Sequence, residues 1–121
     1  MAAAAGLAVL DVIAEEKLRE NARRTGAALR SRLAALSPRF PIIDEVRGAG
    51  LFIGVELRDP VGAAHPDKDA TTRITNGMRD RGVLIGTAGR YGNVLKIRPP
   101  LCMKSEHVDF FIDALERTLA E

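Results

Sequence analysis

The fold of this chain is decided by residues 42–57, which read IIDEVRGAGLFIGVEL. The stretch is rich in β-branched and aliphatic residues and is followed by Asp59-Pro60, a pair typical of turns. It therefore predicts a strand, which we expect to be kinked at Gly48 and Gly50. Its glycines do not match a dinucleotide-binding loop, because such a loop would open a helix where this segment continues as a strand.

The segment before this strand predicts one long helix. Residues 2–36 contain no proline, are rich in Ala, Leu, Arg and Glu, and carry leucines at helical spacing. We expect the helix to bend near Gly26 and to end at Ser37-Pro38. Its N-terminal half has an apolar stripe with no evident partner in the chain, which predicts self-association through this helix or fraying of residues 1 to about 14.

The segment after the strand predicts a short helix, a hairpin and a last helix. The expected elements are a helix capped by Asp69 and followed by Gly82, strands at 83–87 and 94–98, and a helix capped by Ser105. This order predicts an α+β fold, a two-layer small domain of about three mostly antiparallel strands with helices on one face. We expect a single domain over 1–121, with the long helix at 1–36 and the sheet and other helices at 42–121.

Composition limits the classes of function. The 121 residues, 46% of them hydrophobic, suffice for one domain and are too few for a complete multi-domain enzyme. Aromatic residues make up 4%, and 18 Lys and Arg nearly balance 16 Asp and Glu, so nucleic acid is not an expected partner. The single cysteine, Cys102, allows no internal disulfide and favours a cytoplasmic location, and we expect it to be buried.

Export, membrane and metal sites are not predicted. No Lys or Arg precedes the apolar run at 1–13, and Asp11 interrupts it, so we expect neither a secretory signal nor a membrane span. His65 and His107 lie far apart in sequence, with no further ligand at metal-binding spacing.

The main candidates for a binding site are the cations of the last expected strand. Alternation places Lys96 and Arg98 on one face, where two adjacent cations can clamp a carboxylate or phosphate. A solvated sheet face has the same pattern, and Arg47 allows the same two interpretations. The glycines at 86, 89 and 92 favour a plain hairpin turn over an anion-binding loop, because the Lys-Ser/Thr and helix of a P-loop are missing.

Four segments in order resemble a known family. They read GLAVLDVI at 6–13, VRGAGLFIGVEL at 46–57, RGVLIGT at 81–87 and GNVLKIRPPL at 92–101. Together they resemble the C-terminal small domain of class III pyridoxal-phosphate-dependent aminotransferases. The last segment is most similar to the branch that contains alanine–glyoxylate aminotransferases and amino-alcohol phosphate phospho-lyases. The resemblance implies amino-group transfer to a 2-oxo acid, with pyridoxal phosphate as the parent enzyme's cofactor and a large cofactor-binding domain as partner.

The resemblance also assigns substrate-binding residues. In ornithine- and aminobutyrate-type relatives, an arginine ahead of the Pro-Pro pair binds the substrate carboxylate, and that position corresponds to Lys96. Lysine keeps the charge but lacks the two-pronged geometry of a guanidinium. Arg98 and Arg47 are the further substrate-binding candidates that the resemblance implies.

The resemblance implies no catalytic and no cofactor-binding residue in this chain. The family's Schiff-base lysine belongs to the large domain, and no lysine of this sequence matches its motif. We therefore expect an inactive fragment or truncated frame that holds no cofactor. The alternatives are a stand-alone small-molecule-binding or interaction domain, and the small domain of a phospho-lyase.

Overall fold

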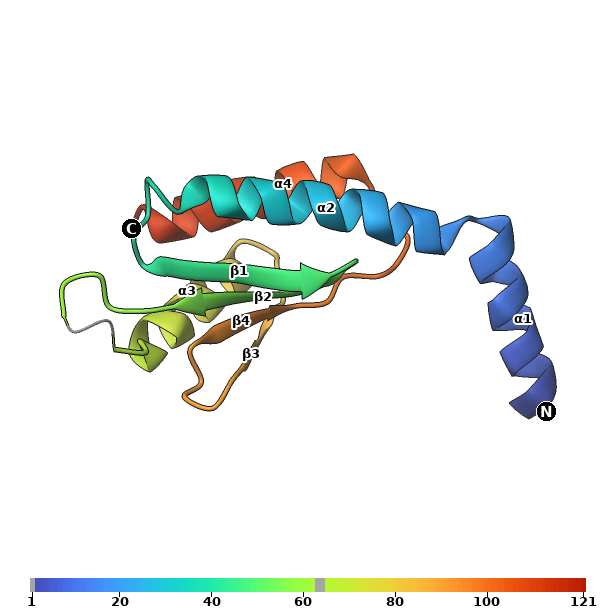
Figure 1. Ribbon diagram of the computed structural model, residues 1–121, viewed down its shortest axis with the longest axis horizontal. Coiled ribbons are helices and arrows are strands. Elements are labelled where there is room, and N and C mark those ends of the chain that lie inside the picture. The colour runs from blue at the N-terminus through green and yellow to red at the C-terminus, as the bar shows by residue number, and fades with distance from the viewer. Residues whose placement is uncertain (1, 63–64) are drawn as a thin grey trace.

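The computed structural model describes residues 2–62 and 65–121, in which four helices and one four-stranded sheet are found (Figure 1). In chain order these are α1 (Ala2–Glu15), α2 (Leu18–Leu36), β1 (Ile43–Ala49), β2 (Phe52–Leu57), α3 (Lys68–Asp80), β3 (Gly86–Ala88), β4 (Val94–Ile97) and α4 (Ser105–Leu119). The strands lie in the order β1-β2-β4-β3, and every pairing among them is antiparallel. The expected α+β fold is confirmed.

One face of the sheet is covered by α2, α3 and α4, and the other is open. Along β2 the buried side chains alternate with those of the opposite face, the buried ones being Ile53, Val55 and Leu57. They share one core with side chains from the three helices, among them Leu33, Met78 and Leu115. The opposite face, which we call the open face, carries Arg47, Gly54, Lys96 and Gly86 on its four strands.

Residues 42–57 form two strands and not the single kinked strand expected, so the sheet has four strands where about three were expected. The two-residue turn Gly50-Leu51 joins β1 to β2, and Ala49 pairs with Phe52 across it. Gly50 has φ +54°, a conformation that glycine adopts without steric cost and that short hairpin turns require. A segment this long exceeds the roughly ten residues of most strands, which was a usable signal for a hairpin.

The expected bend at Gly26 is wrong, because the helix breaks at Glu16 and Lys17. Lys17 has φ 52° and ψ 44°, the left-handed conformation, so the chain changes direction there. Gly26 lies buried within α2, against the β1–β2 turn. A Cβ on Gly26 would lie 1.9 Å from the carbonyl oxygen of Gly50, so the turn rests directly on the helix backbone.

The first helix, α1, projects away from the sheet and the other helices (Figure 1). None of its described residues is buried, and its exposed apolar side chains include Leu7, Val9, Leu10 and Val12. The start of α2 is held firmly by comparison, since Asn21 Nδ2 donates to the carbonyl oxygens of Leu101 at 2.7 Å and Met103 at 2.9 Å. In residues 2–62 and 65–121, no helix combines the length and apolarity that a membrane crossing requires.

Two helix caps differ from expectation. Asp67 caps α3 in place of Asp69, because its side chain accepts a hydrogen bond from the Ala70 N–H at 2.9 Å. The residue before α4 is Lys104 and not Ser105, and its N–H donates to Nδ1 of His107 at 2.9 Å. Gly82 follows α3 with φ +87°, as predicted.

The contact between α2 and the hairpin turn predicts that Gly26→Ala destabilises the fold. The new methyl group must displace the Gly50 backbone, and overpacking of this kind lowers the free energy of unfolding by about 1–3 kcal/mol. Urea denaturation followed by circular dichroism measures the change. Gly6→Ala is the matched control, because a Cβ there meets nothing within 4 Å. Equal midpoints for Gly26→Ala and the unmodified chain would contradict this account of the contact.

Candidate functional site

A row of four residues crosses the open face at one level of the sheet. Arg47 pairs with Gly54, Gly54 with Lys96, and Lys96 with Gly86. Directly paired residues of antiparallel strands point to the same face, so the row places one cation on each side of Gly54, which has no side chain. The structure therefore brings together two of the three candidate residues predicted from the sequence.

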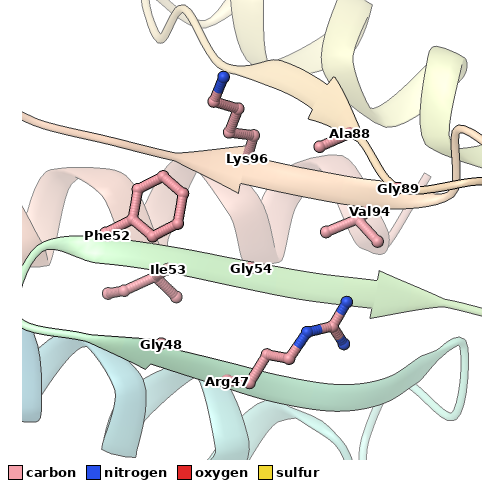
Figure 2. A pocket seen from close by; sticks show the side chains of 9 residues that line it. All are labelled: Arg47, Gly48, Phe52, Ile53, Gly54, Ala88, Gly89, Val94 and Lys96. Carbon is pink, nitrogen blue, oxygen red and sulfur yellow. The ribbon is translucent and has the colours of Figure 1, made fainter.

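The open face is hollowed around Gly54 (Figure 2). The hollow has a volume of about 410 Å³, which lies within the range of small-molecule sites. Phe52, Val94 and Ala88 contribute side chains to its lining, and Gly48 and Gly89 contribute bare backbone. Its lining residues are apolar or glycine apart from the cations Arg47 and Lys96.

Arg47 is engaged by carboxylates. Its Nη1 lies 2.8 Å from Glu56 Oε2 and 3.2 Å from Glu45 Oε2. Nη2 of Arg58 lies 3.0 Å from the other oxygen of Glu56, so this carboxylate sits between two guanidinium groups. The hydrogen bond from Arg47, helped by one from Arg58, lowers the pKa of Glu56 below its ordinary value of 4.5 against the opposing effect of burial. The charge of Arg47 is thus compensated within the sheet.

Lys96 differs from Arg47 in this respect. In the described part of the chain, no carboxylate lies within 4.0 Å of Lys96 or of Arg98. Figure 2 shows the Lys96 side chain extending toward β3 and away from Arg47. The Lys96 ammonium group is therefore the uncompensated cation among the residues that line the hollow.

Arg98 lies beyond the end of β4 and does not itself line the hollow. Its Cζ lies 5.3 Å from the centre of the Phe52 ring, a cation–π contact with a residue that does line it. The ring thus holds the guanidinium group near the edge of the hollow, two residues along the chain from Lys96.

Other sequence features have structural roles or lie elsewhere. Cys102 is exposed, and the expectation of burial is wrong because Met103 takes the core position in the segment that leads to α4. Gly89 and Gly92 form the β3–β4 turn, where the Gly92 N–H donates to the Gly89 carbonyl at 3.2 Å. Among residues 2–62 and 65–121, no three His, Cys, Asp or Glu side chains gather in a metal-binding arrangement.

Sequence reasoning missed Phe52 and Gly54 as parts of the site. Both belong to the segment expected to be one strand, and their position beside Lys96 follows only from the pairing of β2 with β4. Their alternation with buried Ile53 and Val55 was a visible signal that they face away from the core. The order of the strands, which brings them beside Lys96, has no signal in a single sequence.

Comparisons with known proteins match this domain. Residues 1–119 match the family model for class-III aminotransferases. Alanine–glyoxylate aminotransferase 2 homolog 2, mitochondrial, of Arabidopsis thaliana is 43% identical over 117 residues, which cover 97% of this chain and 24% of that protein. The chain therefore belongs to the class-III aminotransferase family.

Two solved structures have the same fold. A phospholyase from Arthrobacter in complex with phosphoethanolamine is 41% identical with a TM-score of 0.94, covering 98% of this chain and 28% of that one. An amine transaminase from an uncultivated Pseudomonas species, solved in its PLP-bound form, is 35% identical with a TM-score of 0.85, covering 97% and 26%. The chain spans about a quarter of the length of the relatives it matches.

The residues at the hollow do not make up a site for pyridoxal phosphate. Proteins hold this cofactor through a lysine that forms a Schiff base and a charged side chain that pairs with the ring nitrogen. Lys96 is the one lysine among the residues that line the hollow, and no Asp or Glu lines it. These residues therefore take no part in holding the cofactor.

The position of Glu56 predicts how stability depends on pH. Because folding lowers the pKa of Glu56, its carboxylate stabilises the folded state above pH 4.5, and this contribution is lost as the pH falls through the lowered value. Glu56→Gln should lower the free energy of unfolding at pH 7 by about 1 kcal/mol or less, since both arginines are partly exposed. Urea denaturation at a series of pH values tests this. If the difference in free energy of unfolding between Glu56→Gln and the unmodified chain stayed the same at the acid end of the series, the prediction would be wrong. Glu15→Gln, on the exposed helix α1, is the control.

Proposed function

We propose that this chain contributes the part of a pyridoxal-phosphate-dependent class III aminotransferase that binds the acidic group of the substrate. The whole enzyme transfers an amino group from an amine or amino acid to a 2-oxo acid. The family match and the relatives' names support this reaction class. The observation that carries the role of this chain is the Lys96 ammonium at a small-molecule-sized hollow, without a carboxylate partner in the described part of the chain.

Lys96 and Arg98 divide the recognition of the acidic group. The Lys96 ammonium offers three donors in any direction, and the Arg98 guanidinium, resting on Phe52, offers a planar set of donors at the edge of the hollow. Arg47 has a secondary role, because two carboxylates already engage its guanidinium group. The apolar lining keeps water away from the bound substrate, which strengthens its electrostatic contacts.

A second candidate function is phospho-lyase chemistry on an amino-alcohol phosphate. Two cations two residues apart on one face suit a doubly charged phosphate, to which charge-assisted hydrogen bonds are strong. The Arthrobacter relative was solved with phosphoethanolamine, which supports this candidate. The relative affinities for a phosphate and a carboxylate ligand distinguish the two functions.

We assign the pyridoxal phosphate to the whole enzyme and none to this chain alone, which on this view is inactive. Borohydride reduction of the chain with the cofactor, followed by peptide mass analysis, tests this assignment, and stoichiometric labelling of Lys96 would overturn it. A cytoplasmic location is part of the proposal. A stand-alone ligand-binding domain would instead bind an amino acid tightly without cofactor.

The role of Lys96 predicts the effect of its substitution. Lys96→Gln should weaken binding of phosphoethanolamine and of L-alanine by about tenfold, the loss expected for a charge-assisted hydrogen bond. Lys96→Arg should retain the affinity for L-alanine, because a guanidinium pairs with a carboxylate through two hydrogen bonds. Isothermal titration or NMR titration of the chain gives these affinities. Lys104→Gln, at the start of α4, is the control, and equal losses in both glutamine variants would contradict the assignment.

The partner of this domain is the large cofactor-binding domain, and we propose that α1 lies against it. A helix whose exposed apolar residues include Leu7, Val9 and Leu10 is poorly stable in water without a covering surface. In the chain on its own, a second copy takes the place of that surface.

This arrangement predicts that the 121-residue chain self-associates through α1. Leu7 and Leu10 lie on the same side of the helix, three residues apart, so Leu7→Glu with Leu10→Glu should shift the chain to monomer. Sedimentation over a dilution series measures the change. Arg23→Glu, on the exposed surface of α2, should leave the association unaltered. If the unmodified chain stayed monomeric at every concentration while α1 was fully helical, self-association through α1 would be ruled out.

A further inference from the structure

Two strand glycines flank Lys96, and at Gly86 no close approach within the fold requires a glycine. Gly54 on β2 and Gly86 on β3 are its direct neighbours across the sheet. Neither has a positive φ, and a Cβ on Gly86 would meet nothing within 4 Å. A Cβ on Gly54 would lie 3.2 Å from Val94 Cγ1, a tight contact that a small shift of the valine side chain relieves. Glycine within a strand lowers stability relative to alanine, so Gly86 weakens the sheet without a gain for the fold, and Gly54 weakens it for the relief of one side-chain contact.

Other glycines of the chain differ clearly from these two. A Cβ on Gly26 would lie 1.9 Å from a backbone oxygen, and one on Gly48 would lie 2.2 Å from the Phe52 carbonyl oxygen. Those glycines are required by close approaches within the domain itself. Strand glycines without such an approach often mark where another molecule comes close to the backbone.

The surroundings of Lys96 favour a small anionic molecule at this place. Gly54 forms part of the floor of the 410 Å³ hollow, and Lys96 stands at its border without a carboxylate partner in the described ranges. On the same face, Phe52 lies two residues before Gly54, and Val94 two residues before Lys96. Because β2 and β4 are antiparallel, these two side chains stand on opposite sides of the glycine–lysine row. They leave a bare strip of backbone between them.

We propose that Gly54 and Gly86 determine substrate specificity by keeping the backbone bare on both sides of Lys96. The strip accepts an amine with a terminal phosphate or carboxylate and a short, unbranched carbon chain. The carbon chain lies flat against β2, β4 and β3 while the acidic group reaches the Lys96 ammonium. This inference rests on the proposed role of Lys96 and adds the shape of the substrate to it.

The test is Gly86→Val in the full 121-residue chain, with phosphoethanolamine as the probe. The valine side chain enters open space and suits a strand, so the melting temperature should be retained or raised. It covers the strip beside Lys96, so the affinity for phosphoethanolamine should fall by about tenfold or more. Gly54→Ala, with its closer Val94 neighbour, should reduce affinity in the same direction.

The matched control is Thr87→Ile, which enlarges the next residue of β3 on the opposite face. It should leave the affinity for phosphoethanolamine unchanged. Binding by Gly86→Val equal to that of the unmodified chain would overturn the inference, as would an unmodified chain that does not bind the probe. Loss of binding in Lys96→Gln but not in Gly86→Val would leave the proposed function standing while the inference fails. Loss of binding in Gly86→Val but not in Lys96→Gln would remove the role of Lys96, and the inference that rests on it would fail as well.

Discussion

The contact between the Gly50 carbonyl and the backbone of α2 is the constraint on which the rest of the domain depends. The absence of a side chain at Gly26 lets the β1–β2 turn rest directly on the helix, and Arg30 Nη1 donates to the same carbonyl at 3.0 Å. This contact settles which face of the β1–β2 hairpin meets the helix. Once Ile53, Val55 and Leu57 face α2, the alternation of the strand sends Phe52, Gly54 and Glu56 to the open face. The hollow is thus a consequence of helix packing on the other side of the sheet.

On the open face, the distribution of carboxylates separates the cations that hold the sheet together from those that can bind a ligand. Glu56 lies between Arg47 and Arg58, and the lowered pKa of its carboxyl group reflects the same two contacts. Arg47 and Arg58 therefore stabilise the pairing of β1 with β2. Lys96, one strand further along, has Gly54 and not a carboxylate as its neighbour on β2. A one-residue slip of β2 against β4 would turn Gly54 to the buried face and remove this difference.

Much of the domain could be predicted from local patterns. The helix of Ser105–Leu119 and the existence of the β3–β4 hairpin follow from spacing and turn residues alone, although β3 begins at Gly86 and not at Val83, and β4 ends at Ile97, one residue before Arg98. The break at Lys17 could not be predicted, because a lysine in the left-handed conformation has no sequence signature. The role of Gly26 could not be predicted, because it depends on a contact with Gly50, which lies far along the chain. The hollow could not be predicted either, because it is formed by the order of the strands, and local sequence patterns do not reveal that order.

The glycines of this chain have different roles, which the structure distinguishes and the sequence alone does not. Gly50 and Gly82 have positive φ and serve turns, and Gly26 and Gly48 admit another backbone. Gly54 and Gly86 have neither property, and both lie beside the one cation of the hollow that lacks a carboxylate among the described residues. Two strands that each lack a side chain beside an uncompensated charge leave room that the domain itself does not use. On our proposal, a molecule that the charge attracts occupies that room.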